Sequence, residues 1–202
     1  MKQSLYKGIH RYTIDPGEYH VARGNVMIST LLGSCVAACL WDPVTRIIGM
    51  NHFLLANNRY ALEVPVIQTE AGRYGIHAME LLINAMLKAG AHKSRLQAKA
   101  FGGGNVLKQQ FSGESFFAVG DVNSRFIVEF LANEGINLQS SNLGGEHGRV
   151  IHFMGSDFSV YMKRIEKVSA EKQLITAEHQ YYHKELSRHT LTDKQSQNVQ
   201  IW

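Results

Sequence analysis

The sequence predicts a mixed α/β (α+β) fold with one main domain. The chain has 202 residues, which is enough for a single sizeable hydrophobic core. Apolar residues make up 45% of it, as in an ordinary globular protein. Two segments repeat apolar residues at a spacing of three and four, which is typical of amphipathic helices, and several short segments resemble strands.

The expected elements follow one another from about residue 18. Two extended pieces within 18–31 surround a turn at 23–25, and two apolar runs surround the turn Asp42-Pro43-Val44-Thr45, as in a β-hairpin. Gly90 suits the C-terminal cap of the first expected helix, and Asp121 suits the N-cap of the second. The remaining expected strands are 36–41, 47–56, 96–101, 136–139, 149–154 and 158–163, and the expected helices are 76–87 and 122–133.

The composition changes at residue 166, where glycine disappears and polar residues dominate. We therefore expect a main domain over residues 1–165 and a C-terminal extension over 166–202 that is partly helical or mobile. His179 and His183 lie four residues apart in this extension, but the glutamate of a metalloprotease helix is missing, so a solvated face is expected. A helix over 169–187 would carry four apolar or aromatic side chains on one side: Leu174, Tyr181, Tyr182 and Leu186.

Composition also excludes several classes of protein. The net charge of +4 is mild and spread along the chain, so no nucleic acid partner is expected. No segment approaches the roughly 18 apolar residues of a membrane helix, and the N-terminus has no apolar signal region, so no membrane insertion or secretion is expected. Two cysteines do not form a disulfide framework, which favours a reducing, cytoplasmic compartment.

Cys35 follows a Gly33-Ser34 bend and begins an apolar run. The spacing from Cys35 to Cys39 is not that of a zinc site, and no second pair of ligands follows. Four residues of strand span ~13 Å, which is too far for a disulfide between the two. For Cys35, core packing and nucleophilic catalysis therefore both stay open, whereas Cys39 is expected in the core. No metal site is therefore expected at these cysteines.

The predicted hairpin favours catalysis. If residue 42 pairs with residue 45, then Cys35 lies opposite His52, with Cβ atoms about 5 Å apart. A histidine at that distance can take the thiol proton and leave the reactive thiolate. A β-bulge would shift this register by one residue.

Other groups near Cys35 suit the same chemistry. The backbone N–H groups of Gly33, Ser34 and Cys35 are candidates for binding an oxyanion, and one such donor is worth roughly 100- to 1,000-fold in rate. A hydroxyl from Ser29 or Thr30 could hold His52 in the tautomer that accepts a proton from sulfur.

Three stretches, LLGSCVAACLWDPVTRIIGMNHFLL, KAFGGGNV and NLGGEHGRVIHF, resemble the CheD family of chemoreceptor glutamine deamidases over about residues 17–164. The resemblance implies a layered α/β sandwich with mixed β-sheets and two main amphipathic helices, like the catalytic fold of bacterial glutamine-deamidating toxins. It also implies that Cys35 and His52 are catalytic, and that the hydroxyl six positions before the cysteine, Ser29, is the third catalytic residue. Thr30 is its immediate neighbour.

The implied reaction is hydrolysis of glutamine side chains on the cytoplasmic helices of chemoreceptors (methyl-accepting chemotaxis proteins), which yields glutamate and ammonia without a cofactor. A CheC-type chemotaxis phosphatase is an implied partner, and the alternative function is binding regulation of that phosphatase. The sequence departs from the family at Asn142, where relatives often carry an acidic residue.

Overall fold

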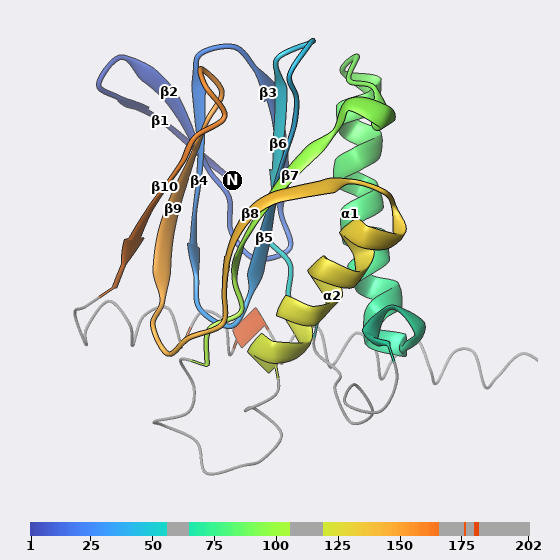
Figure 1. The fold of residues 1–202 in the computed structure, drawn as a ribbon. Helices are drawn as coiled ribbons and strands as arrows, with labels where there is room; N and C mark the ends of the chain where they lie inside the picture. Colours follow the sequence, from blue (N-terminus) through green and yellow to red (C-terminus); the bar gives the residue numbers. More distant parts are fainter. Residues whose placement is uncertain (56–64, 106–118, 166–175, 177–179, 182–202) are drawn as a thin grey trace, which may run out of the picture.

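The computed structural model describes residues 1–55, 65–105 and 119–165, together with residues 176, 180 and 181. The described elements form three layers. Two five-stranded sheets face one another, and helices α1 (Glu70–Lys88) and α2 (Val119–Asn133) cover the outer face of one of them (Figure 1). The expected layered sandwich with mixed sheets and two main helices is therefore confirmed.

Each sheet combines antiparallel pairs with one parallel pair, β2 with β4 in the first sheet and β7 with β8 in the second. The first sheet has the order β1 (Lys2–Tyr6), β2 (Ile9–Thr13), β4 (Val26–Leu32), β9 (Arg149–Met154) and β10 (Val160–Arg164). The second has the order β3 (Tyr19–Arg23), β6 (Ile47–Asn51), β5 (Val36–Asp42), β7 (Gln97–Gly102) and β8 (Asn137–Leu143). Two short 3₁₀ turns are η1 (Val66–Gln68) and η2 (Lys93–Arg95).

Strand β5 is buried on both faces, because one face meets the other sheet and the opposite face meets the helices. Cys39 and Trp41 point into the core between the sheets, while Ala38 and Leu40 point into the core under α1 and α2. This explains why the strand is a continuous apolar run rather than an alternating one.

The two helices lie close to where the sequence predicts them. Gly90 has φ +104° just after α1, as a C-terminal cap requires, and Ala91 N–H donates to Met86 O at 3.0 Å. The expectation for Asp121 is wrong, because α2 begins two residues earlier and Asp121 lies in its first turn. An acidic side chain there still favours the helix through its interaction with the helix dipole.

The hairpin between β5 and β6 differs from the predicted one. Asp42 pairs with Ile47, so the loop has four residues instead of two. Arg46 closes the loop with φ 58°, and its N–H donates to Asp42 O at 2.9 Å. In this register Cys35 is not directly opposite His52. The register differs from the expected one by two residues, which leaves each side chain on its predicted face of the sheet.

The buried carboxylate of Asp42 explains the longer loop. Its Oδ1 accepts from Val44 N–H at 2.9 Å and Thr45 N–H at 3.3 Å. Arg95 donates to its Oδ2 at 2.7 Å, and this guanidinium holds the pKa of Asp42 well below its usual range. A two-residue turn would not offer Asp42 these backbone donors.

Most of residues 166–202, including His179 and His183, lies outside the described residues. Tyr181 is described and packs against the core between the sheets.

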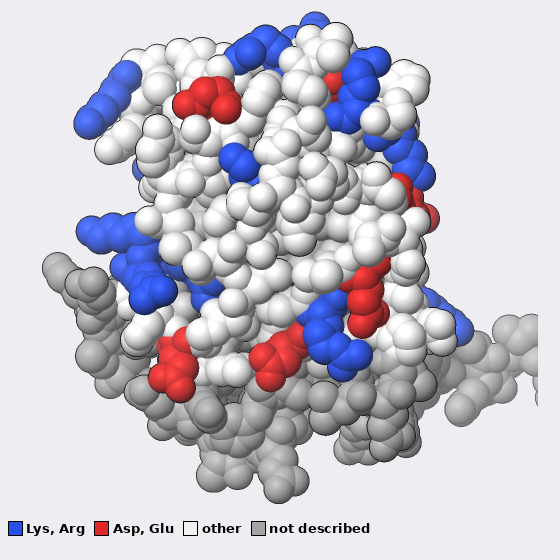
Figure 2. All heavy atoms as spheres, viewed as in Figure 1, with Lys and Arg blue, Asp and Glu red and all other residues white. Residues whose placement is uncertain are grey.

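Figure 2 shows the surface charge of the described residues on one face of the molecule. The Lys and Arg side chains form small groups that are separated by uncharged and acidic residues. Within the described helices, none combines the length and apolarity needed to cross a membrane. The described ranges also hold no group of three or more His, Cys, Asp or Glu side chains suited to a metal ion.

Candidate active site

Cys35, His52 and Thr30 come from three segments that meet between the two sheets. Cys35 lies in the bend between β4 and β5, His52 directly follows β6, and Thr30 belongs to β4 of the facing sheet. All three side chains are buried, with exposed fractions of 0%, 1% and 2%. The structure therefore brings together the two residues of the predicted pair and one of the two candidate hydroxyls.

Cys35 and His52 are diagonal neighbours on one face of the sheet. Val36 and Phe53 form the hydrogen-bonded bridge between them, with N···O distances of 3.0 and 2.9 Å. Cys35 precedes one bridge residue and His52 precedes the other, so both side chains point away from α1 and into the core between the sheets. Diagonal positions on a sheet are separated by about 7–8 Å, which longer side chains can span.

The hydroxyl of Thr30 fixes the tautomer of His52. Thr30 Oγ1 donates its one proton to Ile14 O at 2.8 Å. At His52 Nδ1, also 2.8 Å away, the same oxygen must therefore accept. His52 thus carries its proton on Nδ1, and Nε2 presents the unprotonated lone pair that a base needs.

His52 Nε2 is buried and has no hydrogen-bond partner within the described ranges. Burial lowers the pKa of His52 from 6.5 to about 3, while the negative charge of Glu18 acts in the opposite direction. The imidazole is therefore neutral at neutral pH. A neutral imidazole with a vacant acceptor on the same face as a thiol can act as a general base for it.

The expectation that Ser29 supports His52 is wrong in its geometry. Ser29 Oγ lies 2.8 Å from Nδ1 of His152, which is its direct cross-strand partner on β9. Consecutive residues of a strand point to opposite faces, so Ser29 faces away from the second sheet and Thr30 faces toward it. The hydroxyl that contacts His52 is that of Thr30.

Three hydrogen bonds hold the bend that carries Cys35. Gly104 N–H donates to Gly33 O at 2.7 Å, and Gly103 N–H donates to Cys35 O at 2.8 Å. Asn123 Nδ2 donates to Ser34 O at 3.0 Å. In a trans peptide the N–H points opposite to the preceding C=O. The N–H groups of Ser34 and Cys35 are thus directed away from Gly104 and Asn123, as candidate oxyanion donors must be.

Asn123 on α2 is a site residue that sequence reasoning missed. Its side chain is fully buried, and its Oδ1 accepts from Leu55 N–H at 2.8 Å. Together with the bond to Ser34 O, this amide joins the segment of Cys35 to the segment of His52. A polar residue on the apolar stripe of α2 was the available signal, because a buried amide in a native protein is normally hydrogen-bonded.

Arg149 holds the loop around Asn142 and Gly144, which packs on the glycine turn that follows β7. It is buried, and Nη1 donates to Asn142 Oδ1 at 2.6 Å, while Nη2 donates to the carbonyl of Gly144. Gly144 N–H in turn donates to Gly102 O at 2.9 Å. Burial and the nearby charge of Arg164 lower the pKa of Arg149. The amide of Asn142 therefore occupies a position at which a carboxylate would pair with a buried charge.

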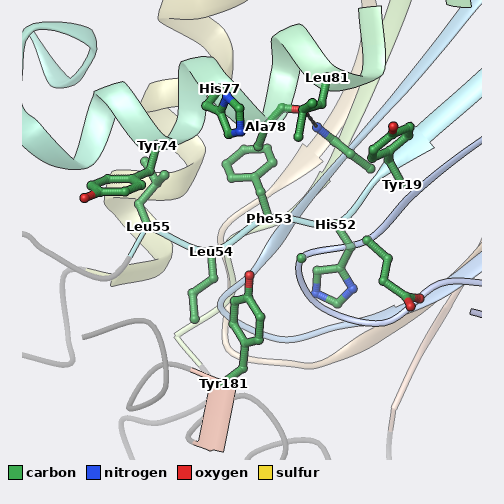
Figure 3. A pocket seen from close by; sticks show the side chains of 13 residues that line it. Tyr19, His52, Phe53, Leu54, Leu55, Tyr74, His77, Ala78, Leu81 and Tyr181 are labelled. Carbon is green, nitrogen blue, oxygen red and sulfur yellow. Dashed lines mark hydrogen bonds between the residues drawn. The ribbon is translucent and has the colours of Figure 1, made fainter. Parts of the chain in front are cut away.

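A cavity of about 150 Å³ lies beside His52 (Figure 3). It is bounded by α1, by the start of β3 and by the segment that follows β6, and the described residue Tyr181 forms part of its wall. A Cβ atom built on Gly17 would lie 2.4 Å from the Tyr181 hydroxyl, so Gly17 allows this close approach. The described lining residues are Gly17, Glu18, Tyr19, Asn51, His52, Phe53, Leu54, Leu55, Tyr74, His77, Ala78, Leu81 and Tyr181.

Comparison with known proteins decides the family. The sequence model of CheD, described as CheD chemotactic sensory transduction, matches residues 63–164. A protein of Geobacter sulfurreducens named "Probable chemoreceptor glutamine deamidase CheD 1" is 52% identical over 177 residues, which is 88% of this chain and 87% of that protein. The chain belongs to the CheD family. The Geobacter CheD alignment covers so much of this chain that it necessarily includes Thr30, Cys35 and His52.

Other CheD proteins are similar over most of their length. "Probable chemoreceptor glutamine deamidase CheD 2" of Shewanella oneidensis is 47% identical over 171 residues, covering 84% of each chain. A Rhizobium johnstonii CheD of the same descriptive name is 48% identical over 144 residues, covering 71% of this chain and 73% of its own. The crystal structure of the Bacillus licheniformis hypothetical protein YfiH gives a TM-score of 0.32 at 13% identity, covering 61% of this chain and 49% of that one, and supports no conclusion here.

Proposed function

We propose that this chain is a protein-glutamine glutaminase that hydrolyses glutamine side chains on chemoreceptors to glutamate and releases ammonia. Its CheD relatives are named for this activity. The observation that carries the proposal is the state of His52, whose Nδ1 is held by Thr30 and whose buried Nε2 has no partner in the described chain. A cysteine on the same face of the sheet completes a nucleophile and base.

In the first step, the Cys35 thiol gives its proton to His52 Nε2 as sulfur bonds to the amide carbon of the glutamine side chain. The developing oxyanion is bound by the backbone N–H groups of Ser34 and Cys35. Thr30 then accepts from the protonated ring at Nδ1, which keeps the imidazolium in place. Because burial disfavours a charged His52, we place proton transfer together with attack rather than before it.

In the second step, the C–N bond breaks and His52 gives its proton to the departing nitrogen, which leaves as ammonia. The carbonyl is now a thioester on Cys35. A water molecule from solvent loses a proton to His52 Nε2 and adds to the thioester carbon. The C–S bond then breaks, the proton returns to sulfur, and glutamate is released. The scheme balances without a metal or an organic cofactor.

Access, location and partners complete the proposal. Cys35 and His52 are buried, so the target side chain reaches them from the side of the molecule on which the cavity beside His52 opens. The cytoplasm suits the two free cysteines. We propose a CheC-type phosphatase as a further binding partner. Regulation of that phosphatase is not proposed as the main function of this chain, because a pure binding protein does not need a buried histidine whose Nε2 can accept a proton.

The direct test is incubation of a purified receptor cytoplasmic fragment with the wild-type protein, with Cys35→Ala and with the matched control Cys39→Ala. Cys39 is also a buried cysteine of the same core, and burial raises its thiol pKa. Mass spectrometry should find glutamine-to-glutamate conversion with wild type and Cys39→Ala and none with Cys35→Ala. Equal conversion by Cys35→Ala and wild type would refute the proposal.

A further inference from the structure

Helix α1 carries a partly exposed apolar stripe beside its core face, and Ala78 in the middle of this stripe also packs against the core. Its buried face, which includes Met79 and Leu82, packs on the second sheet. Tyr74, Ala78 and Leu81 follow one another at spacings of four and three residues on a neighbouring face, and Tyr74 and Leu81 are each 41% exposed. Single exposed apolar residues are ordinary, but a stripe at helical spacing beside a cavity points to a binding surface.

This stripe borders the cavity beside His52. In Figure 3, Tyr74, Ala78 and Leu81 line it from α1, and Tyr19 of β3 is drawn next to Leu81. Tyr19 is 40% exposed, so β3 also contributes a partly exposed aromatic side chain to the cavity lining. A cavity of about 150 Å³ is of the size that accepts a benzene-sized group, which corresponds to one apolar side chain rather than a whole segment.

The charge of the lining residues further limits which kind of side chain the cavity can accept. Among the described lining residues, Glu18 is the one acidic or basic side chain apart from the two histidines, and its pKa is lowered, so it is an anion at neutral pH. Glu18 is already paired with the N-terminal ammonium of Met1, so it does not call for a cationic occupant. Burying any charge against Phe53 and Leu81 would be unfavourable. A neutral, apolar side chain therefore fits best.

We propose that the stripe and the cavity form a docking groove for an amphipathic helix of the receptor, which places an apolar side chain in the cavity and the neighbouring glutamine at Cys35. This rests on the proposed deamidase function. From Tyr74 to Leu81 the stripe covers about two turns, roughly 10 Å, which is enough to align one short helical segment. In helix-in-groove recognition the bound helix presents apolar anchors at the same spacing. Because His52 lines the same cavity as Tyr74 and Leu81, a helix bound there would lie beside the proposed catalytic pair. The substrate is therefore a better occupant than an unrelated partner.

The test measures binding in a Cys35→Ala background, so that it does not depend on turnover. The probe is the purified helical cytoplasmic fragment of a receptor. Tyr74→Ala combined with Leu81→Ala should weaken its Kd at least tenfold. Val128→Ala should leave it unchanged, because Val128 is 45% exposed on α2 and is absent from the cavity lining, which makes it a matched control.

Circular dichroism and thermal unfolding of each variant confirm that the fold is retained. An unchanged Kd in the folded double variant overturns the groove, even if wild-type protein deamidates the fragment. Sedimentation tests whether a second copy of this chain, rather than the receptor, occupies the groove. If the wild-type chain forms a dimer that the double variant abolishes, the occupant is a second copy and the inference is wrong. Failure of the deamidase proposal shows separately, as absence of glutamate in the wild-type reaction.

Discussion

Thr30 Oγ1 lies 2.8 Å from His52 Nδ1, across the layer between the two sheets. The same oxygen donates to Ile14 O, so it can only accept from the imidazole. One hydroxyl thereby sets which ring nitrogen of His52 is free to act as a base. Strand alternation gives this role to Thr30 and directs Ser29 to His152 on the outer face of the first sheet.

Thr30→Ala should slow deamidation, whereas Ser29→Ala should leave the rate within about twofold of wild type. Removing one partner of a buried polar group costs about 1–3 kcal/mol, which corresponds to roughly a 5- to 150-fold lower kcat. Thr30→Ser keeps the hydroxyl and should restore most of the rate. Steady-state kinetics on a receptor fragment measure all three variants, and a larger loss in Ser29→Ala than in Thr30→Ala would contradict the assignment.

Acidification should destabilise the protein through His52. Burial lowers its pKa from 6.5 to about 3, so between these values the unfolded chain binds a proton that the folded chain does not. This contribution is fully present above about pH 6.5 and declines as the pH falls, by at most about 1.4 kcal/mol per pH unit. The lowered pKa values of His20 and His152 act in the same direction.

Urea unfolding at a series of pH values from about 7 to 5 measures this slope, in a range above most carboxylate pKa values. His52→Gln should show a shallower slope than wild type. Equal slopes for the two proteins would mean that folding does not lower the pKa of His52.

Asn123→Asp should lower kcat more than it raises KM. The carboxylate still accepts from Leu55 N–H, but it cannot donate to Ser34 O and places negative charge against that carbonyl. The bend that carries Cys35 should therefore move. The exposed Asn133 on the same helix supplies the control Asn133→Asp, which should be neutral. A folded Asn123→Asp variant with wild-type kcat would remove Asn123 from the positioning role.

Asn142→Asp should stabilise the fold. Arg149 is buried and bonds to the Asn142 amide oxygen and to carbonyls, so a carboxylate at position 142 would pair with its charge. Charge-assisted hydrogen bonds contribute about 1.5–3 kcal/mol. Thermal unfolding of Asn142→Asp and Arg149→Met provides the measurement. We expect a higher Tm for the first and a lower Tm for the second, and a lower Tm for Asn142→Asp would show that Arg149 needs no carboxylate.

Tyr181→Ala should raise KM with little change in kcat. Tyr181 lines the cavity beside His52 and approaches Gly17, and it transfers no proton in the proposed scheme. Such contacts contribute uniform binding. Tyr181→Phe keeps the ring and should stay close to wild type. Truncation after Val168 should resemble Tyr181→Ala, and a collapse of kcat with the fold intact would show that residues 166–202 help build the catalytic site.

Much of the fold was predictable because local signals and tertiary packing agree. Both helices, and the strands β5 and β7, follow from apolar periodicity and from the glycines beside them. Strand β1 was missed because all of its side chains are exposed, so no alternation marks it. The loop after Asp42 was predicted too short because it wraps around a buried carboxylate, and the Arg95 partner of that carboxylate lies far along the chain and leaves no local trace.

In the candidate site, too, features set by local sequence were predicted and features set by tertiary packing were not. The predicted shared face of Cys35 and His52 survived a register error of two residues, because side-chain direction on a strand repeats every two residues. Ser29 was implied by the resemblance to the CheD family, while the residues alone left Ser29 and Thr30 both open. The apolar neighbours Ile28 and Leu32, two residues either side of Thr30, would have selected Thr30 instead. Asn123 could not be placed, because its two partners are set by how α2 packs on the sheet.

The central claim, that Cys35 attacks a receptor glutamine with His52 as its base, is tested most directly by trapping the thioester. Wild-type protein is mixed with a receptor fragment, quenched in acid within one turnover, and analysed by intact-mass and peptide mapping. The account predicts an adduct on Cys35 whose mass is the sum of the two chains less one ammonia. The adduct should be present in Cys39→Ala and absent in Cys35→Ala. Glutamate formation by Cys35→Ala at the wild-type rate, with no adduct in any variant, would contradict it.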